Sequence, residues 1–141
     1  GLRLGLLFQG VGKTDGYLNT YYVMPSNQGG TFRKEHIDFA CAANPGGVTP
    51  RLTSANKNNW YDSSFWMKSA AYLRLKNIEL SYTLPDRWMK RIHINNARIF
   101  IQGVNLLTFS KFKLWDVELG DGRGAKYPNI GSVSLGINFN F

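Results

Sequence analysis

The chain has few of the residues that build metal, redox and catalytic sites. Its 141 residues include one cysteine, Cys41, and two histidines. A lone cysteine makes no internal disulfide and no Cys-x-x-Cys pair for a metal or for redox chemistry. His36 and His93 are far apart in the sequence and have no nucleophile pattern around them. We therefore predict no metal, no cofactor, no catalytic residues and no enzymatic activity.

Long apolar runs and acidic residues are also scarce. No stretch approaches the roughly 18 consecutive apolar residues of a transmembrane helix, so residence in a membrane would have to be through strands. The 9 acidic residues stand against 17 Lys and Arg, which gives a formal net charge of +8. A positive charge of this size suits nucleic acid, anionic lipid or acidic ligands, and by itself it does not choose among them.

The most regular pattern lies in the last eleven residues, Gly131 to Phe141. Every second residue from Val133 onward is apolar, and the residues between are small or polar. This period of two predicts a strand with one apolar and one polar face. Its length matches the roughly 9 to 11 residues with which a tilted strand crosses a bilayer. A transmembrane β-barrel and an amphipathic strand of a soluble sandwich both produce this pattern.

The spacing of the predicted strands favours the barrel. We predict four strands, near residues 2–10, 70–84, 96–109 and 131–141. Their connections are long, short and long, as in outer-membrane barrels, where periplasmic turns are short and external loops are long. On this basis we expect external loops near 12–65 and 111–128 and a periplasmic turn at 85–95.

The strand count and the first residues suggest a longer protein. Four strands cannot close a membrane barrel, for which eight is about the lower limit. The sequence also opens inside a strand pattern, without an initiator Met, a charged leader or a cleavage site. We expect the chain to be the C-terminal part of a larger barrel, and upstream sequence would test this. The role of Cys41 stays open.

Several sequence blocks together resemble one protein family. They are Leu7–Gly10, Tyr17–Asn19, Tyr72–Pro85, Ala97–Phe100, Gln102–Phe109, Lys111–Phe112, Trp115–Asp116 and Tyr127–Pro128. The chain is similar in these blocks to the C-terminal end of SusC/RagA-type TonB-linked outer-membrane transporters of Bacteroidetes. Only the interior of the 12–65 segment is unfamiliar.

The resemblance implies a fold and a location. The fold would be all-β, with the four antiparallel strands coming from the C-terminal end of a 22-stranded transmembrane β-barrel in the cell outer membrane of a Gram-negative bacterium. Outer-membrane lipid, lipopolysaccharide and the barrel-assembly machinery would be partners. The aromatic residues Phe139 and Phe141 would form the terminal signal that this machinery recognises.

The resemblance also implies a function. Such proteins import oligosaccharides or peptides beneath a SusD-like surface lipoprotein, and they couple to TonB through N-terminal parts that this sequence does not contain. This chain would supply barrel wall and external loops only. Two alternatives stay open: a non-transport surface protein such as an adhesin, and a soluble basic all-β module that binds polyanions. We expect no nucleic-acid partner.

The 12–65 segment ends in a cluster of aromatic and amide side chains. The cluster consists of Asn59, Trp60, Tyr61, Phe65 and Trp66. Flat aromatic faces beside amides hold sugars and also form protein interfaces. Three interpretations stay open: packing within the loop, contact with a lid partner, and direct contact with a ligand.

Four basic residues extend the expected lipid-facing sides of two strands. If Ile78 faces lipid, strict alternation puts Arg74 and Lys76 on the same side and nearer the outer leaflet. The next strand gives the same placement to Lys111 and Lys113. We hypothesise that the four bind phosphates of outer-leaflet lipopolysaccharide, with solvated charge as the alternative.

Three acidic residues follow Trp115, namely Asp116, Glu118 and Asp121. Their spacing does not fit an EF-hand calcium loop. A glycosidase pair would need two carboxylates about 5 to 10 Å apart in a cleft, which spacing alone does not establish. We interpret them as solvated loop residues.

Overall fold

A computed structural model describes residues 1–25, 31–53, 57–90, 93–120 and 122–140. The chain forms two compact units. The sheet unit comprises Gly1–Thr14, Ala70–Glu118 and Pro128–Phe141, and the loop unit comprises Asp15–Ser69 and Leu119–Tyr127. Among the described residues, no helix is both long enough and apolar enough to cross a membrane.

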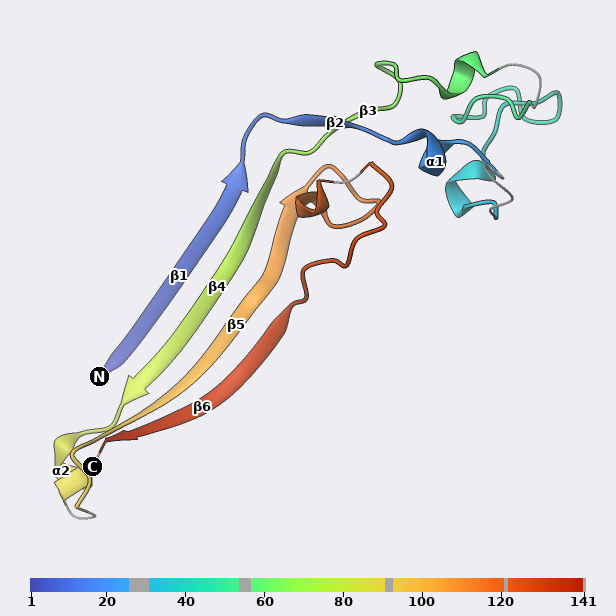
Figure 1. The fold of residues 1–141 in the computed structure, drawn as a ribbon. Coiled ribbons are helices and arrows are strands. Elements are labelled where there is room, and N and C mark those ends of the chain that lie inside the picture. Colours follow the sequence, from blue (N-terminus) through green and yellow to red (C-terminus); the bar gives the residue numbers. More distant parts are fainter. Residues whose placement is uncertain (26–30, 54–56, 91–92, 121, 141) are drawn as a thin grey trace. The chain divides into compact units, whose positions relative to one another are not determined.

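The sheet unit is a four-stranded antiparallel sheet. Its strands are β1 (Leu2–Val11), β4 (Tyr72–Thr83), β5 (Asn96–Ser110) and β6 (Ser132–Asn140), and they lie side by side in the order β1-β4-β5-β6 (Figure 1). Pro85 ends the β4 ladder because it has no N–H to donate, and the short helix α2 (Asp86–Met89) then turns the chain toward β5. The predicted all-β class with four antiparallel strands is confirmed.

One face of this sheet is apolar from strand to strand. A single row across the sheet joins Leu4 to Leu80, Leu80 to Ile101 and Ile101 to Leu135. Within this unit nothing covers the row, because Leu4 is 60% and Leu135 76% exposed. The same face carries Leu2, Leu6, Phe8, Leu73, Leu75, Ile78, Tyr82, Ile99, Leu107, Phe109, Val133, Ile137 and Phe139. So large an apolar surface needs a partner or lipid to cover it.

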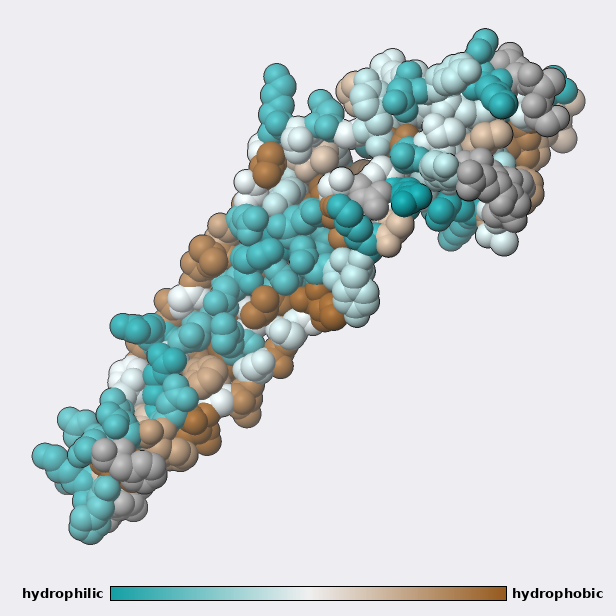
Figure 2. Space-filling model, viewed as in Figure 1, coloured by the Kyte–Doolittle hydropathy of each residue, from teal (hydrophilic) through white to brown (hydrophobic). Residues whose placement is uncertain are grey.

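The opposite face is largely polar. Arg98 Nη1 lies 3.5 Å from Glu79 Oε1, and the Arg98 guanidinium lies 5.4 Å from the centre of the Phe100 ring. The Phe100 ring in turn covers Gly136, where a Cβ atom would overlap three ring carbons. In Figure 2, hydrophilic side chains run along the viewed face of the sheet and hydrophobic ones emerge at its margins. The two faces therefore meet different surroundings.

The alternation changes phase once along β4. Leu75 and Asn77 both pair with β5 and β1, whereas Lys76 between them is an extra residue in the ladder. On β5 the matching irregularity contains Asn105, whose φ of 53° is in the left-handed region that asparagine tolerates better than most residues. A β-bulge of this kind moves the side chains beyond it to the opposite faces.

The 12–65 segment, predicted as a loop, contains regular structure of its own. Its strand β2 (Asp15–Tyr17) pairs antiparallel with β3 (Met67–Ser69), which follows the segment, and between them lie helix α1 (Thr20–Val23) and the 3₁₀ turns η2 (Lys34–His36) and η3 (Asn58–Trp60). Asn19 caps α1 by accepting a hydrogen bond from the Tyr21 N–H at 2.9 Å. The buried residues of the loop unit are Leu18, Tyr22, Val23, His36, Trp60 and Trp66. They give it a small core.

His36 has a structural role in that core. Its Nδ1 accepts the Arg33 N–H at 3.1 Å, so Nε2 carries the ring proton and donates to the Tyr22 carbonyl oxygen at 3.2 Å. Both ring nitrogens are therefore engaged, and the ring is 4% exposed.

Candidate functional site

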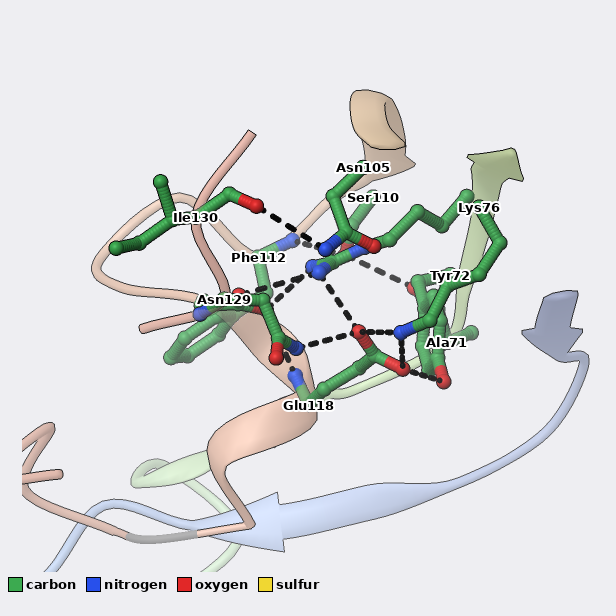
Figure 3. Close-up of polar contacts among 11 residues, drawn as sticks. Ala71, Tyr72, Lys76, Asn105, Ser110, Phe112, Glu118, Asn129 and Ile130 are labelled. Atoms are coloured by element: carbon green, nitrogen blue, oxygen red, sulfur yellow. Dashed lines mark hydrogen bonds and ion pairs between the residues drawn. The ribbon is translucent and has the colours of Figure 1, made fainter. Parts of the chain in front are cut away.

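A buried arginine near the start of β4 is the centre of a charged network, and Figure 3 labels Tyr72, Lys76, Glu118 and Asn129 among the other members. The side chain of Arg74 is 3% exposed. Its guanidinium donates to both carboxylate oxygens of Asp116, with Nη1 at 3.2 Å from Oδ2, and Nη1 also lies 2.7 Å from Glu118 Oε2. A buried charge is tolerated when it is paired and hydrogen-bonded, which explains why two carboxylates converge on this one cation.

A second ring of groups surrounds Glu118. The Tyr72 hydroxyl donates to Glu118 Oε1 at 2.9 Å, and Lys76 Nζ lies 3.3 Å from Oε2. Asn129 Nδ2 donates to Oε2 at 2.7 Å, while the Asn129 N–H donates to Asp116 Oδ2 at 3.0 Å (Figure 3). These contacts therefore attach both the early and the late part of the β5–β6 connection to β4. We call the group Tyr72, Arg74, Lys76, Asp116, Glu118 and Asn129 the Arg74 network.

The chain is similar in sequence to parts of known proteins. No protein-family model matches the chain. TonB-dependent receptor P26 of Formosa agariphila is 29% identical in an alignment that covers 79% of this chain and 13% of that receptor. TonB-dependent receptor P39 of the same organism is also 29% identical, and the alignment covers 76% of this chain and 11% of that receptor. The chain thus spans a small part of the length of the curated relatives it matches.

Solved structures show the same fold over the whole chain. The RagAB peptide importer in its open-open state superposes with a TM-score of 0.73 at 24% identity, covering 100% of this chain and 16% of that one. The RagAB peptide transporter gives a TM-score of 0.75 at 23% identity with the same coverage. The chain is similar to a segment of TonB-dependent receptors and has the fold of the corresponding part of the RagAB transporter. The resemblance found in the sequence blocks is confirmed.

Within the Arg74 network, Asp116 is held in its charged form. Burial by itself would raise the pKa of Asp116, because it disfavours the carboxylate. The hydrogen bonds from Arg74 and from the backbone N–H groups of Glu118 and Asn129 outweigh that effect, and the pKa lies below its ordinary value. The network is therefore built around an ionised carboxylate.

The Arg74 network should consequently loosen only in acid. A carboxyl group whose pKa is lowered by folding stabilises the folded state above its unfolded pKa, about 3.9, and this contribution is lost as the pH falls through the lowered value. A fluorine label on a cysteine introduced at Lys111 of the intact receptor should give a constant ¹⁹F NMR spectrum from pH 7 to about 4. The Asp116→Asn variant should show the low-pH spectrum already at pH 7. A wild-type transition near neutral pH would contradict the assignment.

The five aromatic and amide residues predicted as a contact site separate into two groups. Trp60 and Trp66 are 3% and 8% exposed, with their ring centroids 6.1 Å apart, and Trp66 Nε1 donates to the Asn59 carbonyl oxygen at 2.8 Å. The two tryptophans pack within the loop unit, whereas the Asn59 side chain is exposed. Tyr61 and Phe65 are 63% and 48% exposed. Contact with a lid partner or a ligand stays a prediction, and Asn59, Tyr61 and Phe65 have the side chains accessible for it.

The orientation predicted for Arg74 and Lys76 is wrong. Strict alternation from Ile78 would put Arg74 on the apolar face, but the bulge at Lys76 puts Arg74 beside Gln9 on the opposite face. Both cations are engaged with carboxylates in the Arg74 network. The alternation from which contact between these two residues and lipopolysaccharide was predicted therefore does not hold.

The other two basic residues of that hypothesis, Lys111 and Lys113, follow β5 and are exposed. Their contact with lipopolysaccharide stays a prediction. Phe139 lies on the apolar face and is 53% exposed, and Phe141 lies outside the described residues. Their role as an assembly signal also stays a prediction.

The acidic residues were the part of the network that sequence reasoning missed. Asp116 and Glu118 are not solvated, since their side chains are 9% and 12% exposed. The sequence contains a usable signal, because the apolar residues of β4 change from odd positions, Leu73 and Leu75, to even ones from Ile78 onward. That change indicates a bulge and places Arg74 on the polar face. Among the described residues, no three His, Cys, Asp or Glu side chains gather as metal ligands.

Proposed function

We propose that this segment forms part of the wall and external loops of an outer-membrane nutrient importer. The observation that carries the proposal is the apolar sheet face, on which Leu135 at 76% exposure and its neighbours lack any protein cover within the unit. Lipid is the natural cover for such a face, since a membrane barrel turns one side of each strand to hydrocarbon. The receptor relatives and the RagAB fold support the same conclusion.

The location and cargo follow from the family. The protein would reside in the cell outer membrane of a Gram-negative, Bacteroidetes-like bacterium and import oligosaccharides or peptides. TonB would supply the energy through N-terminal parts of the receptor outside this segment. In this scheme the segment performs no bond chemistry, and the receptor names of its relatives support this.

A SusD-like surface lipoprotein is the proposed partner of the loop unit. Tyr61 and Phe65 present accessible aromatic surface beside a packed tryptophan pair. Aromatic side chains are enriched in protein interfaces and dominate their binding energy. A rigid aromatic platform of this kind is suited to contact with a lid protein.

Uptake and co-purification test the proposal together. We expect deletion of the receptor gene, or of tonB, to abolish uptake of labelled oligosaccharide or peptide, and plasmid-borne receptor to restore it. Changing Tyr61 and Phe65 together to alanine should reduce co-purification of the lipoprotein about tenfold or more, the range of an interface hot spot. The control is Tyr127→Ala, an aromatic of the loop unit that is more exposed, at 79%.

Two outcomes would count against it. Uptake that survives deletion of the receptor, together with a loss of surface adhesion, would favour the adhesin alternative. An equal effect of Tyr127→Ala and of the Tyr61 and Phe65 changes would remove the specific role given to those two side chains.

A further inference from the structure

A cavity of about 320 Å³ lies within the sheet unit beside the Arg74 network. Its size falls at the lower end of the range of small-molecule sites, roughly 300 to 1,000 Å³. The lining residues used below are Arg74, Asn105, Phe112, Lys113, Trp115 and Asp116. They come from β4, from the bulge of β5 and from the connection that follows it, so the cavity exists only where strand and loop are joined.

Two buried polar atoms of this lining lack a hydrogen-bond partner among the described residues. They are Arg74 Nε, a donor, and Asn105 Oδ1, an acceptor. Asn105 Nδ2 donates to the Ile130 carbonyl oxygen at 3.1 Å, which fixes the amide so that Oδ1 is its free end. An unpaired buried polar group is destabilising, because it gives up its hydrogen bonds to water without replacing them. A guest that accepts from Arg74 and donates to Asn105 would satisfy both.

The charge of the lining favours an anionic guest. Arg74 and Lys76 are balanced by Asp116 and Glu118, so the network itself is formally neutral. Lys113 adds one positive charge to the cavity lining. This positive charge attracts an anionic guest more than a neutral one.

One wall of the cavity is apolar. The rings of Phe112 and Trp115 meet edge to face, with centroids 4.9 Å apart. This pair can pack against the carbon atoms of a guest.

From these features we propose that the cavity binds a small hydroxycarboxylate. The carboxylate accepts from Arg74 Nε–H and pairs with Lys113, and a hydroxyl group donates to Asn105 Oδ1. An amino acid fits less well because its ammonium group would add a cation beside Arg74 and Lys113. The site goes beyond the proposed transport function and does not depend on it, since binding is measured without transport.

Three six-carbon probes separate the features of such a ligand. Gluconate carries a carboxylate and hydroxyls, glucitol carries hydroxyls only, and adipate carries carboxylates without hydroxyls. Saturation-transfer NMR on the intact, detergent-solubilised receptor should show saturable binding of gluconate. Glucitol and adipate should displace it only at concentrations about tenfold higher, because each lacks one charge-assisted or hydroxyl contact.

Matched lysine variants locate the site. Lys113→Gln should weaken gluconate binding about threefold to tenfold, and Lys111→Gln, an exposed neighbour outside the cavity lining, should leave it unchanged. Gluconate that gives no saturable signal with the wild-type receptor would overturn the proposal. So would equal displacement by glucitol, or equal affinities of the two lysine variants.

Discussion

Replacing Arg74 with alanine in the intact receptor should release the segment 111–118 from the sheet. The change leaves Asp116 and Glu118, now 9% and 12% exposed, without their common cation. Removing one partner of a buried ion pair typically costs about 3 to 5 kcal/mol, because an uncompensated charge remains. Hydrogen exchange of peptides that cover 111–118 should speed up accordingly, and trypsin should cut more readily after Lys113.

The control for this prediction is a more exposed ion pair of the same sheet. Arg98 and Glu79 are 32% and 29% exposed and 3.5 Å apart, so Arg98→Ala should change stability by about 1 kcal/mol or less. Adding Asp116→Asn and Glu118→Gln to Arg74→Ala should recover part of the protection, since no buried charge is then left unpaired. If hydrogen exchange of residues 111–118 were unchanged in the Arg74→Ala variant, Arg74 would not be what holds this segment on the sheet.

Replacing Leu135 with arginine should destabilise the receptor in the membrane. Leu135 lies on the apolar face in the row that runs through Ile101 and Leu80. A lipid-facing arginine near the middle of a bilayer costs about 2 to 4 kcal/mol in barrel proteins. Urea titration of receptor refolded in liposomes should show a lowered free energy of unfolding, and the amount of receptor in outer-membrane fractions should fall.

The adjacent residue supplies the matched control. Ser134 precedes Leu135 on β6, pairs with Gln102 and faces the polar side of the sheet. Ser134→Arg should therefore be tolerated within about 1 kcal/mol, since a polar interior accepts charge. Equal losses for the two arginine variants, or none for either, would show that the apolar face does not meet lipid.

Most of the sheet could be predicted from the sequence because period-two patterns are local. Residues such as Val133, Leu135 and Ile137 reveal their shared face without any knowledge of the neighbouring strand. The loop unit was harder to predict, because the three-residue strands β2 and β3 are separated by about fifty residues and too short to show a period. Its buried Trp60 and Trp66 were recognised as an aromatic cluster, and only packing distinguishes them from the exposed Tyr61.

The charged site could be predicted only in part, for a different reason. Arg74 was assigned to the wrong face because one parity was carried across Lys76, although Leu73 and Leu75 already showed the change. The pairing of Arg74 with Asp116 spans 42 residues and two strands. No local pattern encodes such a contact, since it depends on the register of β4 with β5 and on the path of the connection after β5.

The Arg74 network also joins parts of the chain that are far apart in sequence. β4 precedes its carboxylate partners in the chain, so a sheet of β1 and β4 alone would leave the Arg74 guanidinium without these counter-charges. The hairpin of β5 and β6 carries Asp116, Glu118 and Asn129 in its own connection. It follows that the Arg74 network is complete only once β4 and the β5–β6 connection have come together, so its contacts report on the joining of these parts of the wall.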